Sequence, residues 1–250
     1  LNRPLKNGNT LIHHIEQKNK ANYRYEKTFN TKVYEGKKYY GKNYKAFNGV
    51  PIIINTIKKL KKSKIFDKII VSTNSNKISK IAKKYGAKVP FKRPKILSNG
   101  YASGTSVISH CIKFLMKKGY QFDYVCCVYA PNPFLKIDDL KKGYKKIKSK
   151  KFDYVFAATP YHFPYFRSFT FTKKSGVKMI FYKNYKKRSQ DLDEILCDAG
   201  QFYWGKKRAW LQKKVIFAKN SDIVVVPKWR YQDIDTLDDW KRAEILSRVL

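Results

Sequence analysis

Residues 123–129, DYVCCVY, are the stretch that decides the fold class. This short apolar run is typical of a strand that is buried on both faces of a sheet. Helices are expected on either side of it, over residues 106–118 and 138–148. A buried strand between two helices predicts an α/β architecture with a mostly parallel sheet.

The same alternation continues in both directions along the chain. Gly86 and Gly119 each stand where a helix is expected to end. By contrast, residues 1–47 are polar and no buried strand is expected among them, and residues 160–187 are irregular and β-like. Further strands are expected over residues 67–73, 87–91, 153–159 and 222–227, and further helices over residues 50–62, 76–85 and 237–250.

Length and composition limit the class of protein. A chain of 250 residues with 43% hydrophobic residues and 16% aromatic residues can bury one sizeable core, which argues for a single domain and against disorder. No apolar run approaches the roughly 18–20 residues of a membrane span. The four cysteines are unevenly spaced and form neither a disulfide framework nor a zinc site. A reducing, cytoplasmic setting without membrane contact is therefore expected.

The net charge of +37 indicates anionic partners. Lysine far outnumbers arginine and is spread along the whole chain, whereas arginine is the better residue for forked contacts to phosphates and bases. Specific nucleic-acid binding is therefore not expected, although a basic nucleic-acid-binding protein stays open as an alternative hypothesis. The charge favours small anionic substrates, such as a nucleoside triphosphate or a sugar acid.

Asp233 and Asp235 form the strongest candidate site. Two carboxylates at positions i and i+2 point to the same side of an extended segment. That spacing suits a Mg²⁺ ion held by one or two carboxylates together with water and substrate phosphates. The alternative is an acidic first helical turn, with Thr236 as the N-cap and Asp238 and Asp239 favoured by the helix dipole. Both interpretations can hold at once.

Three other motifs each have a plain structural alternative. The run DAGQFYWG, residues 198–205, either lets a ligand approach its glycines or packs in the core. Arg188, in a basic loop, either pairs with an anion through its fork or is a solvated charge. The turn at Ser103 and Thr105 either receives an anionic group or only caps a helix.

Taken in order, these segments resemble the acylneuraminate cytidylyltransferases, most closely the pseudaminic acid branch of that family. The resemblance covers residues 41–250 and implies a Rossmann-like three-layer nucleotidyltransferase fold with a small β-rich dimerisation insertion. It implies that CTP is coupled to a nine-carbon sugar acid with Mg²⁺, giving a CMP-sugar and pyrophosphate. The stretches that carry it are KNYKAFNG (42–49), VSTNS (71–75), VPFKRP (89–94), DYVCCVYAPNPFL (123–135), RSQD (188–191), DAGQFYWG (198–205) and QDIDTLDDW (232–240).

The resemblance also assigns roles to residues. It implies a homodimer in which the region near residues 160–190 reaches toward the partner's site. Asp233 and Asp235 would hold the metal, and these two with Lys37 and Arg188 would be catalytic. The remaining implied contacts are Lys37, Lys38, Lys42 and Asn43 at the triphosphate, Arg93, Ser103 and Thr105 at the cytidine, and Tyr129, Arg188, Gln190 and Gln201 at the sugar acid.

The first 40 residues depart from the family pattern. The family's glycine-rich triphosphate loop falls on residues 32–38, where Lys37 is kept, Lys38 is a like-charged replacement and both loop glycines are gone. Residues 1–40 are therefore described as an atypical polar segment before a cytidylyltransferase domain at residues 41–250. Two hypotheses follow from this departure. The chain is either an active enzyme or a family member that is impaired at the triphosphate loop.

Overall fold

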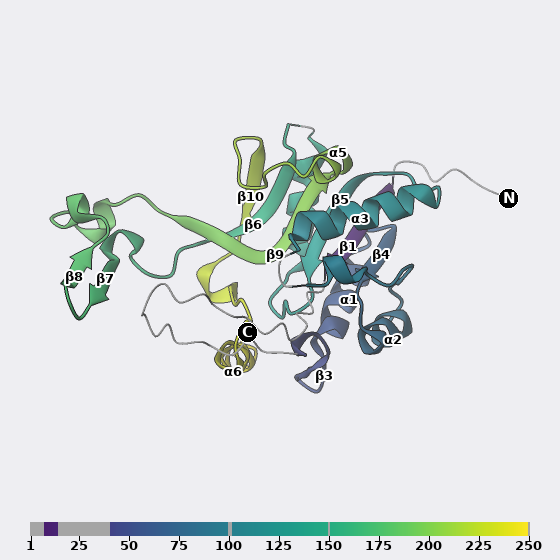
Figure 1. The fold of residues 1–250 in the computed structure, drawn as a ribbon, viewed down its shortest axis with the longest axis horizontal. Helices are drawn as coiled ribbons and strands as arrows, with labels where there is room; N and C mark the ends of the chain where they lie inside the picture. The colour runs from purple at the N-terminus through teal and green to yellow at the C-terminus, as the bar shows by residue number, and fades with distance from the viewer. Residues whose placement is uncertain (1–7, 15–40, 100–101, 150, 250) are drawn as a thin grey trace.

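The structure is a computed structural model that describes residues 8–14, 41–99, 102–149 and 151–249, with the backbone alone for residues 8–14. Its main body is a six-stranded mixed sheet in the order β10-β6-β9-β5-β1-β4 (Figure 1). All neighbouring pairs are parallel except those that involve β9. The strands are β1 (Gly8–His14), β4 (Lys68–Ser72), β5 (Phe122–Tyr129), β6 (Tyr154–Pro160), β9 (Leu196–Lys206) and β10 (Ser221–Val225).

Strand β1 corrects the expectation that residues 1–47 contain no buried strand. Its backbone lies between β4 and β5 and pairs in parallel with both, with Leu11 level with Ile69 on one side and Cys126 on the other. The segment GNTLIHH has only two adjacent apolar residues among polar ones, so neither alternation nor an apolar run identifies it. The segment is a strand because its backbone forms hydrogen bonds with β4 and β5, and the local sequence pattern does not record these partners.

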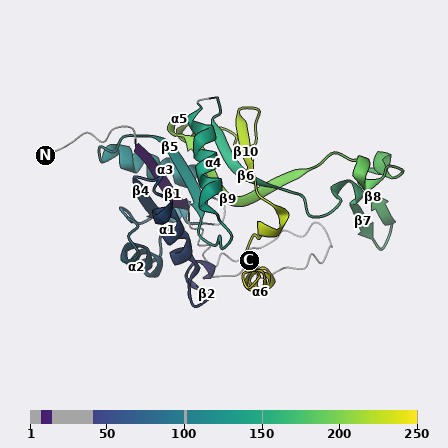
Figure 2. The ribbon, with the colours of Figure 1, turned by 180° about the vertical axis from the view of Figure 1, so that it is seen from behind.

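Helices cover both faces of the sheet, giving three layers (Figures 1 and 2). On one face, α1 (Ile52–Ser63), α2 (Asn76–Lys84) and α4 (Ile137–Lys148) share a hydrophobic core with alternate residues of the strands. On the other face, α3 (Gly104–Lys117) and α5 (Lys207–Leu211) pack on the intervening strand residues. Cys126 belongs to the first core and Cys127 to the second, as expected for a strand buried on both faces.

Strand β9 is a second strand of the main sheet that the sequence did not identify. It runs antiparallel between β5 and β6 and belongs to both cores, because Phe202 and Trp204 face one and Tyr203 faces the other. Trp204 also donates its indole N–H to the carbonyl oxygen of Leu140 in α4, at 3.1 Å. The run DAGQFYWG is therefore a core strand over most of its length.

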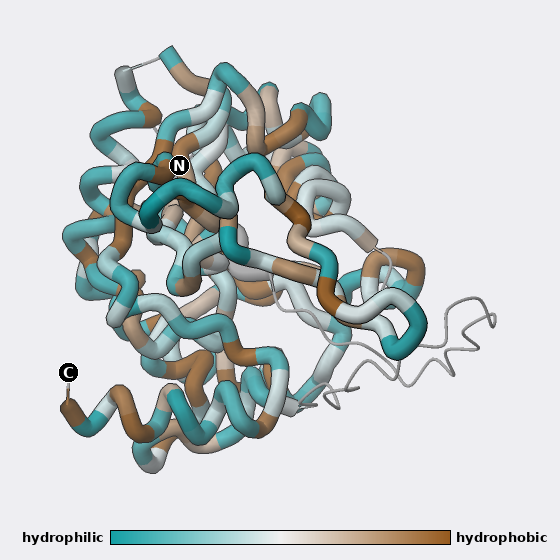
Figure 3. Tube along the Cα trace, turned by 90° about the vertical axis from the view of Figure 1, so that its left-hand side faces the viewer, coloured by the Kyte–Doolittle hydropathy of each residue, from teal (hydrophilic) through white to brown (hydrophobic). Residues whose placement is uncertain are grey.

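Between β6 and β9 the chain leaves the body as an arm, residues 161–195. The arm carries the hairpin of β7 (Phe169–Thr172) and β8 (Gly176–Met179), which lies far from the sheet in Figures 1 and 2. In Figure 3 this side of the molecule faces the viewer, and the trace nearest to the viewer carries both hydrophilic and hydrophobic residues. The expectation of an irregular, β-like region over residues 160–187 is confirmed.

The other predicted elements are found within a few residues, with one exception. The prediction of a strand over residues 87–91 is wrong, because this stretch makes only an isolated bridge, between Lys88 and Ile70, and another follows it between Lys92 and Thr73. The last helix, α6 (Leu237–Leu246), is shorter than expected and lies below the sheet in Figure 1. Two short strands, β2 (Ala46–Phe47) and β3 (Val50–Pro51), form a separate hairpin before α1.

Gly143 in α4 gives a test of the core packing, because packing decides whether an alanine at this position raises or lowers the stability of the protein. Replacing a helical glycine by alanine stabilises a solvent-exposed helix by up to about 1 kcal/mol. Here a Cβ would lie 2.8 Å from Cδ1 of Trp204 and 2.9 Å from Cε2 of Phe202, both of which are buried. We expect Gly143→Ala to lower the free energy of unfolding by about 1–3 kcal/mol. Urea unfolding measures it, with Lys142→Ala as the control; a gain in stability would contradict the packing.

Candidate active site

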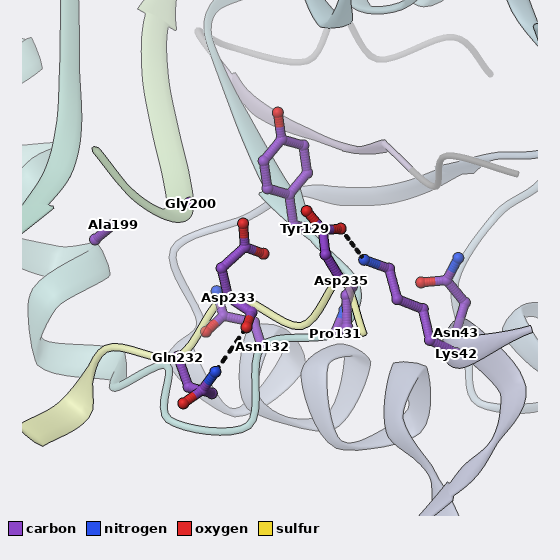
Figure 4. A pocket seen from close by; sticks show the side chains of 10 residues that line it. All are labelled: Lys42, Asn43, Tyr129, Pro131, Asn132, Ala199, Gly200, Gln232, Asp233 and Asp235. Atoms are coloured by element: carbon purple, nitrogen blue, oxygen red, sulfur yellow. Dashed lines mark hydrogen bonds and ion pairs between the residues drawn. The ribbon is translucent and has the colours of Figure 1, made fainter. Parts of the chain in front are cut away.

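A pocket opens where four segments meet at the carboxyl end of β5 (Figure 4). The segments are the short helix η1 (Lys42–Tyr44), the loop after β5, a turn within β9 and the stretch before α6. This end of a parallel sheet is where α/β proteins bind their ligands. The described residues that line the pocket are Lys42, Asn43, Tyr129, Pro131, Asn132, Ala199, Gly200, Gln232, Asp233 and Asp235.

The start of α6 holds the segment that carries the two candidate carboxylates. Thr236 is the N-cap of α6, and with Asp239 it forms a reciprocal capping box. The Asp239 carboxylate also accepts a hydrogen bond from the backbone N–H of Asp235 at 3.1 Å. The capping interpretation is therefore confirmed for Thr236 and Asp239, and it leaves the side chains of Asp233 and Asp235 at the pocket, as Figure 4 shows.

Buried contacts of Ile234 and Arg230 also hold the segment that carries Asp233 and Asp235. Ile234, between the two aspartates, is fully buried and packs with Trp240 of α6. Three residues before Asp233, Arg230 donates to the Asp139 carboxylate of α4 at 2.5 Å, and their side chains are only 7% and 5% exposed. Removing one partner of such a buried pair leaves an uncompensated charge, so the pair fixes where this segment lies.

Lys42 links the short helix η1 to the stretch before α6. Its ammonium lies 2.9 Å from Oδ1 of Asp235 and also donates to the carbonyl oxygen of Ile234 (Figure 4). Desolvation, and then the negative charge of Asp235, raises the pKa of Asp233, while Lys42 acts in the opposite direction. The pocket therefore holds two acidic groups that repel each other and one cation that offsets part of that repulsion.

The side of the pocket opposite Lys42 is formed by a turn in β9, at Ala199 and Gly200. Gly200 has a left-handed φ of 57°, a conformation that favours glycine. Its N–H donates to Oδ1 of Asp198 at 2.9 Å, and the other oxygen of that carboxylate accepts from the Tyr203 hydroxyl at 2.5 Å. Burial is the main cause that raises the pKa of Tyr203, so this phenol stays a donor and keeps the turn in place.

The loop after β5 is fixed from two sides. The Thr56 hydroxyl of α1 donates to the carbonyl oxygen of Ala130 at 2.8 Å, and Lys59 donates to that of Pro133 at 2.6 Å. On the other side, the Asn132 amide donates to the carbonyl oxygen of Gln201 in β9 at 3.1 Å. These contacts place Tyr129 and Asn132 beside the aspartates.

The donor set suits a hard divalent cation. Carboxylate oxygens are the ligands that Mg²⁺ takes, and it commonly keeps one or two of them together with water and substrate phosphates. Asp233 and Asp235 supply such oxygens, and the nearby ammonium of Lys42 suits a phosphate. Among the described residues there is no group of three or more acidic, histidine or cysteine side chains that could hold a metal by itself. These residues thus fit an ion shared with a phosphate ligand.

The predicted site residues divide into two groups in the structure. The pocket brings together Lys42, Asn43, Tyr129, Asp233 and Asp235, from both ends of the chain. Gly200 also lines the pocket, in line with the interpretation that a ligand approaches the glycines of DAGQFYWG, whereas Gln232 received no role from the sequence although it lies inside QDIDTLDDW.

The second group consists of predicted residues that do not line this pocket or that lie outside the described part of the chain. Gln201 is buried behind it, where its amide donates to the carbonyl oxygen of Arg230 at 3.1 Å. Arg188 and Gln190 are exposed on the arm, and Arg188 makes a forked pair with Asp191. The remaining members are Arg93, which is buried after β4, Ser103 and Thr105 at the capped start of α3, and Lys37 and Lys38, which lie outside the described residues.

Comparison with known sequences assigns the family. A sequence model of the cytidylyltransferases matches residues 36–221. The pseudaminic acid cytidylyltransferase of Campylobacter jejuni subsp. jejuni serotype O:2 is 41% identical over 208 residues, which cover 83% of this chain and 90% of that protein. The N-acylneuraminate cytidylyltransferase of Oncorhynchus mykiss is 30% identical and covers 84% of this chain and 46% of that protein.

Solved structures show the same fold. A CMP:2-keto-3-deoxy-manno-octonic acid synthetase complexed with CTP aligns with a TM-score of 0.65 at 11% identity, over 97% of this chain and all of that chain. A 4-diphosphocytidyl-2C-methyl-D-erythritol synthase from Anaerococcus prevotii aligns with a TM-score of 0.58 at 12% identity, with the same coverage of both chains. The Rossmann-like α/β nucleotidyltransferase fold is thus confirmed, and the chain belongs to the cytidylyltransferase family.

Proposed function

We propose that this cytidylyltransferase couples CTP to pseudaminic acid, a nine-carbon sugar acid, and releases pyrophosphate. The choice of sugar acid is supported by the identity of about 40% to two Campylobacter jejuni enzymes that are named for pseudaminic acid. Relatives named for N-acylneuraminate are more distant, at 30% and 28% identity. A cytoplasmic location stays a prediction, and no helix in the described ranges is long and apolar enough to cross a membrane.

The observation that carries the proposal is the meeting of Asp233, Asp235 and Lys42 beside Tyr129 and Asn132. In this reaction a hydroxyl of the sugar acid attacks the α-phosphate in line, and pyrophosphate leaves from the other side. Phosphoryl transfer of this kind requires positioning and charge neutralisation rather than a covalent nucleophile. The hydrogen-bonded walls of the pocket would position the substrates, and Lys42 and the two aspartates with their metal ion would neutralise charge.

Each residue then has a stated part in the proposed reaction. Asp233 and Asp235 would hold Mg²⁺, which when bound neutralises phosphate charge. Lys42, held in place by Asp235 and the carbonyl oxygen of Ile234, would lie against the triphosphate. Tyr129 and Asn132 would face the sugar acid, because they line the pocket beside the two aspartates.

The arm suggests a homodimer, as the family resemblance implies. Cross-strand partners lie on the same face of a hairpin, and here Phe169 stands opposite Met179 and Phe171 opposite Val177. Phe169, Phe171 and Val177 are more than 60% exposed. An exposed apolar patch of this kind marks an interaction surface. We propose that this hairpin docks on a second copy and that Arg188 completes the partner's site, since Arg188 is not among the described residues that line its own pocket.

The two aspartates give the first test of the proposed activity. We expect Asp233→Asn and Asp235→Asn each to lower pyrophosphate release from CTP and pseudaminic acid by about 10²–10³-fold, because each removes charge from the cation site. Asp238→Asn is the matched control, because the Asp238 side chain is exposed and is not among the described residues that line the pocket. Its ion pair with Lys241, at 3.9 Å, is also on the surface. We expect it to keep wild-type activity and all three variants to keep the wild-type melting temperature.

Three results would contradict the proposed function. Equal loss in the Asp238→Asn control would show a general charge effect. Release that prefers N-acetylneuraminic acid would overturn the proposed sugar acid. No release from folded wild-type protein with either acid would favour the impaired family member that the altered residues 32–38 suggested, and those residues lie outside the described ranges.

A mixed dimer tests whether the arm acts on the partner. One protomer carries Arg188→Ala and the other carries Asp233→Asn with Asp235→Asn, and two affinity tags isolate the mixed species. If Arg188 acts across the interface, one pocket of each mixed dimer is intact, and activity should return to about half of the wild-type value. If Arg188 acts within its own chain, both pockets stay defective. Isolated mixed dimers without recovered activity, or a protein that sediments as a monomer, would contradict the proposal.

A further inference from the structure

A second pocket lies behind the loop after β5, on the side away from the active site. The two pockets share this loop but no lining residue, because Pro131 and Asn132 line the first and Pro133, Phe134 and Leu135 line the second. The second pocket is also lined by Phe47, Lys58, Lys59, Lys136, Trp229 and Arg230.

The charge of the second pocket is opposite to that of the active site. It has three lysines, Lys58, Lys59 and Lys136, and no acidic residue among its described lining residues. Its one arginine, Arg230, is already paired with Asp139. The three lysines make no ion pair with any described carboxylate at 4 Å or less, so the pocket has positive charge to offer an anion.

Lys59 is the residue best placed to bind that anion. It is partly buried on α1, and its Nζ donates to the carbonyl oxygen of Pro133 at 2.6 Å. An ammonium has three N–H donors, so this contact leaves two for a ligand. Burial, and then the positive charge of Lys136, lowers the pKa of Lys59. An anion between Lys59 and Lys136 would relieve this repulsion.

The walls of the second pocket favour a ligand that also has a flat apolar part. Trp229 is 50% exposed, whereas Trp204, Trp210 and Trp240 are at most 1% exposed. A half-exposed indole beside a cavity offers a stacking surface. The Nζ of Lys136 lies 5.4 Å from the centre of the Trp229 ring, so the cationic and aromatic groups adjoin.

We propose that this second pocket is a binding site for a phosphate monoester that carries an aromatic ring. The phosphate lies between Lys59 and Lys136, and the ring packs on Trp229 with Phe47 and Phe134 beneath it. The dianion matches the two ammoniums, and the ring covers apolar surface that water otherwise contacts. The site does not depend on the activity proposed above, since it uses none of the active-site residues.

Phenyl phosphate is the probe for this site, and Trp229 is the reporter. Trp229 is the one tryptophan of the four in the chain that lines the second pocket, so a ligand bound there changes its emission, and Trp229→Phe should abolish that change. We expect a saturable change in emission with phenyl phosphate, binding at least about tenfold weaker with inorganic phosphate, and no change with phenol. The double variant Lys59→Gln with Lys136→Gln should weaken binding by about tenfold or more, because it removes two charge-assisted contacts.

Matched variants separate this site from the general charge of the protein. Lys62→Gln with Lys142→Gln removes the same charge from exposed lysines of α1 and α4 outside the pocket, and should leave affinity within about twofold. Lys42→Gln should also leave it unchanged. Equal weakening by the control pair would show nonspecific attraction, and weakening by Lys42→Gln would place the probe in the active site. Equal affinity for inorganic phosphate would show that the ring contributes nothing. Each of these results overturns the proposal, and melting curves confirm that all variants fold.

Discussion

The antiparallel insertion of β9 between β5 and β6 is the constraint on which the rest of the structure depends. Its hydrogen bonds close the centre of the sheet, and Phe202, Trp204 and Tyr203 fill both cores. The same strand brings the turn at Gly200 to the carboxyl end of β5. It also carries the chain back from the arm, so sheet, pocket and arm all rely on one element.

A small set of buried polar contacts then converts this scaffold into a site. Asn132 bonds to the backbone of Gln201, and Gln201 bonds to the backbone of Arg230, whose guanidinium pairs with Asp139. Because buried polar groups lose much free energy when unpaired, each contact strongly favours one arrangement of its segment. The carboxylates of Asp233 and Asp235 can therefore lie close together at the pocket, because buried contacts fix the backbone that carries them.

Charge is distributed in a way that suits two different anionic ligands. Around the active site, lysine and aspartate are adjacent, which fits a phosphate that arrives with a cation. Behind the loop after β5, three lysines and a half-exposed indole line a pocket that has no acidic residue among its described lining residues. The high net charge of the chain is thus arranged differently at two neighbouring places, which composition alone does not reveal.

Local pattern in the sequence determined the alternation of helices and strands, the buried character of DYVCCVY and the capping of α6, because periodicity and capping depend on near neighbours. The family motifs likewise pointed to Asp233, Asp235 and Lys42. Only the tertiary structure placed Lys42 against Asp235, 193 positions away, and left Arg188, on the arm, out of the described pocket lining. It also made strands of GNTLIHH and of the aromatic run at residues 198–205. Pairing between distant segments decides such features, since each strand gains its hydrogen bonds and its buried faces from neighbours that no local pattern records.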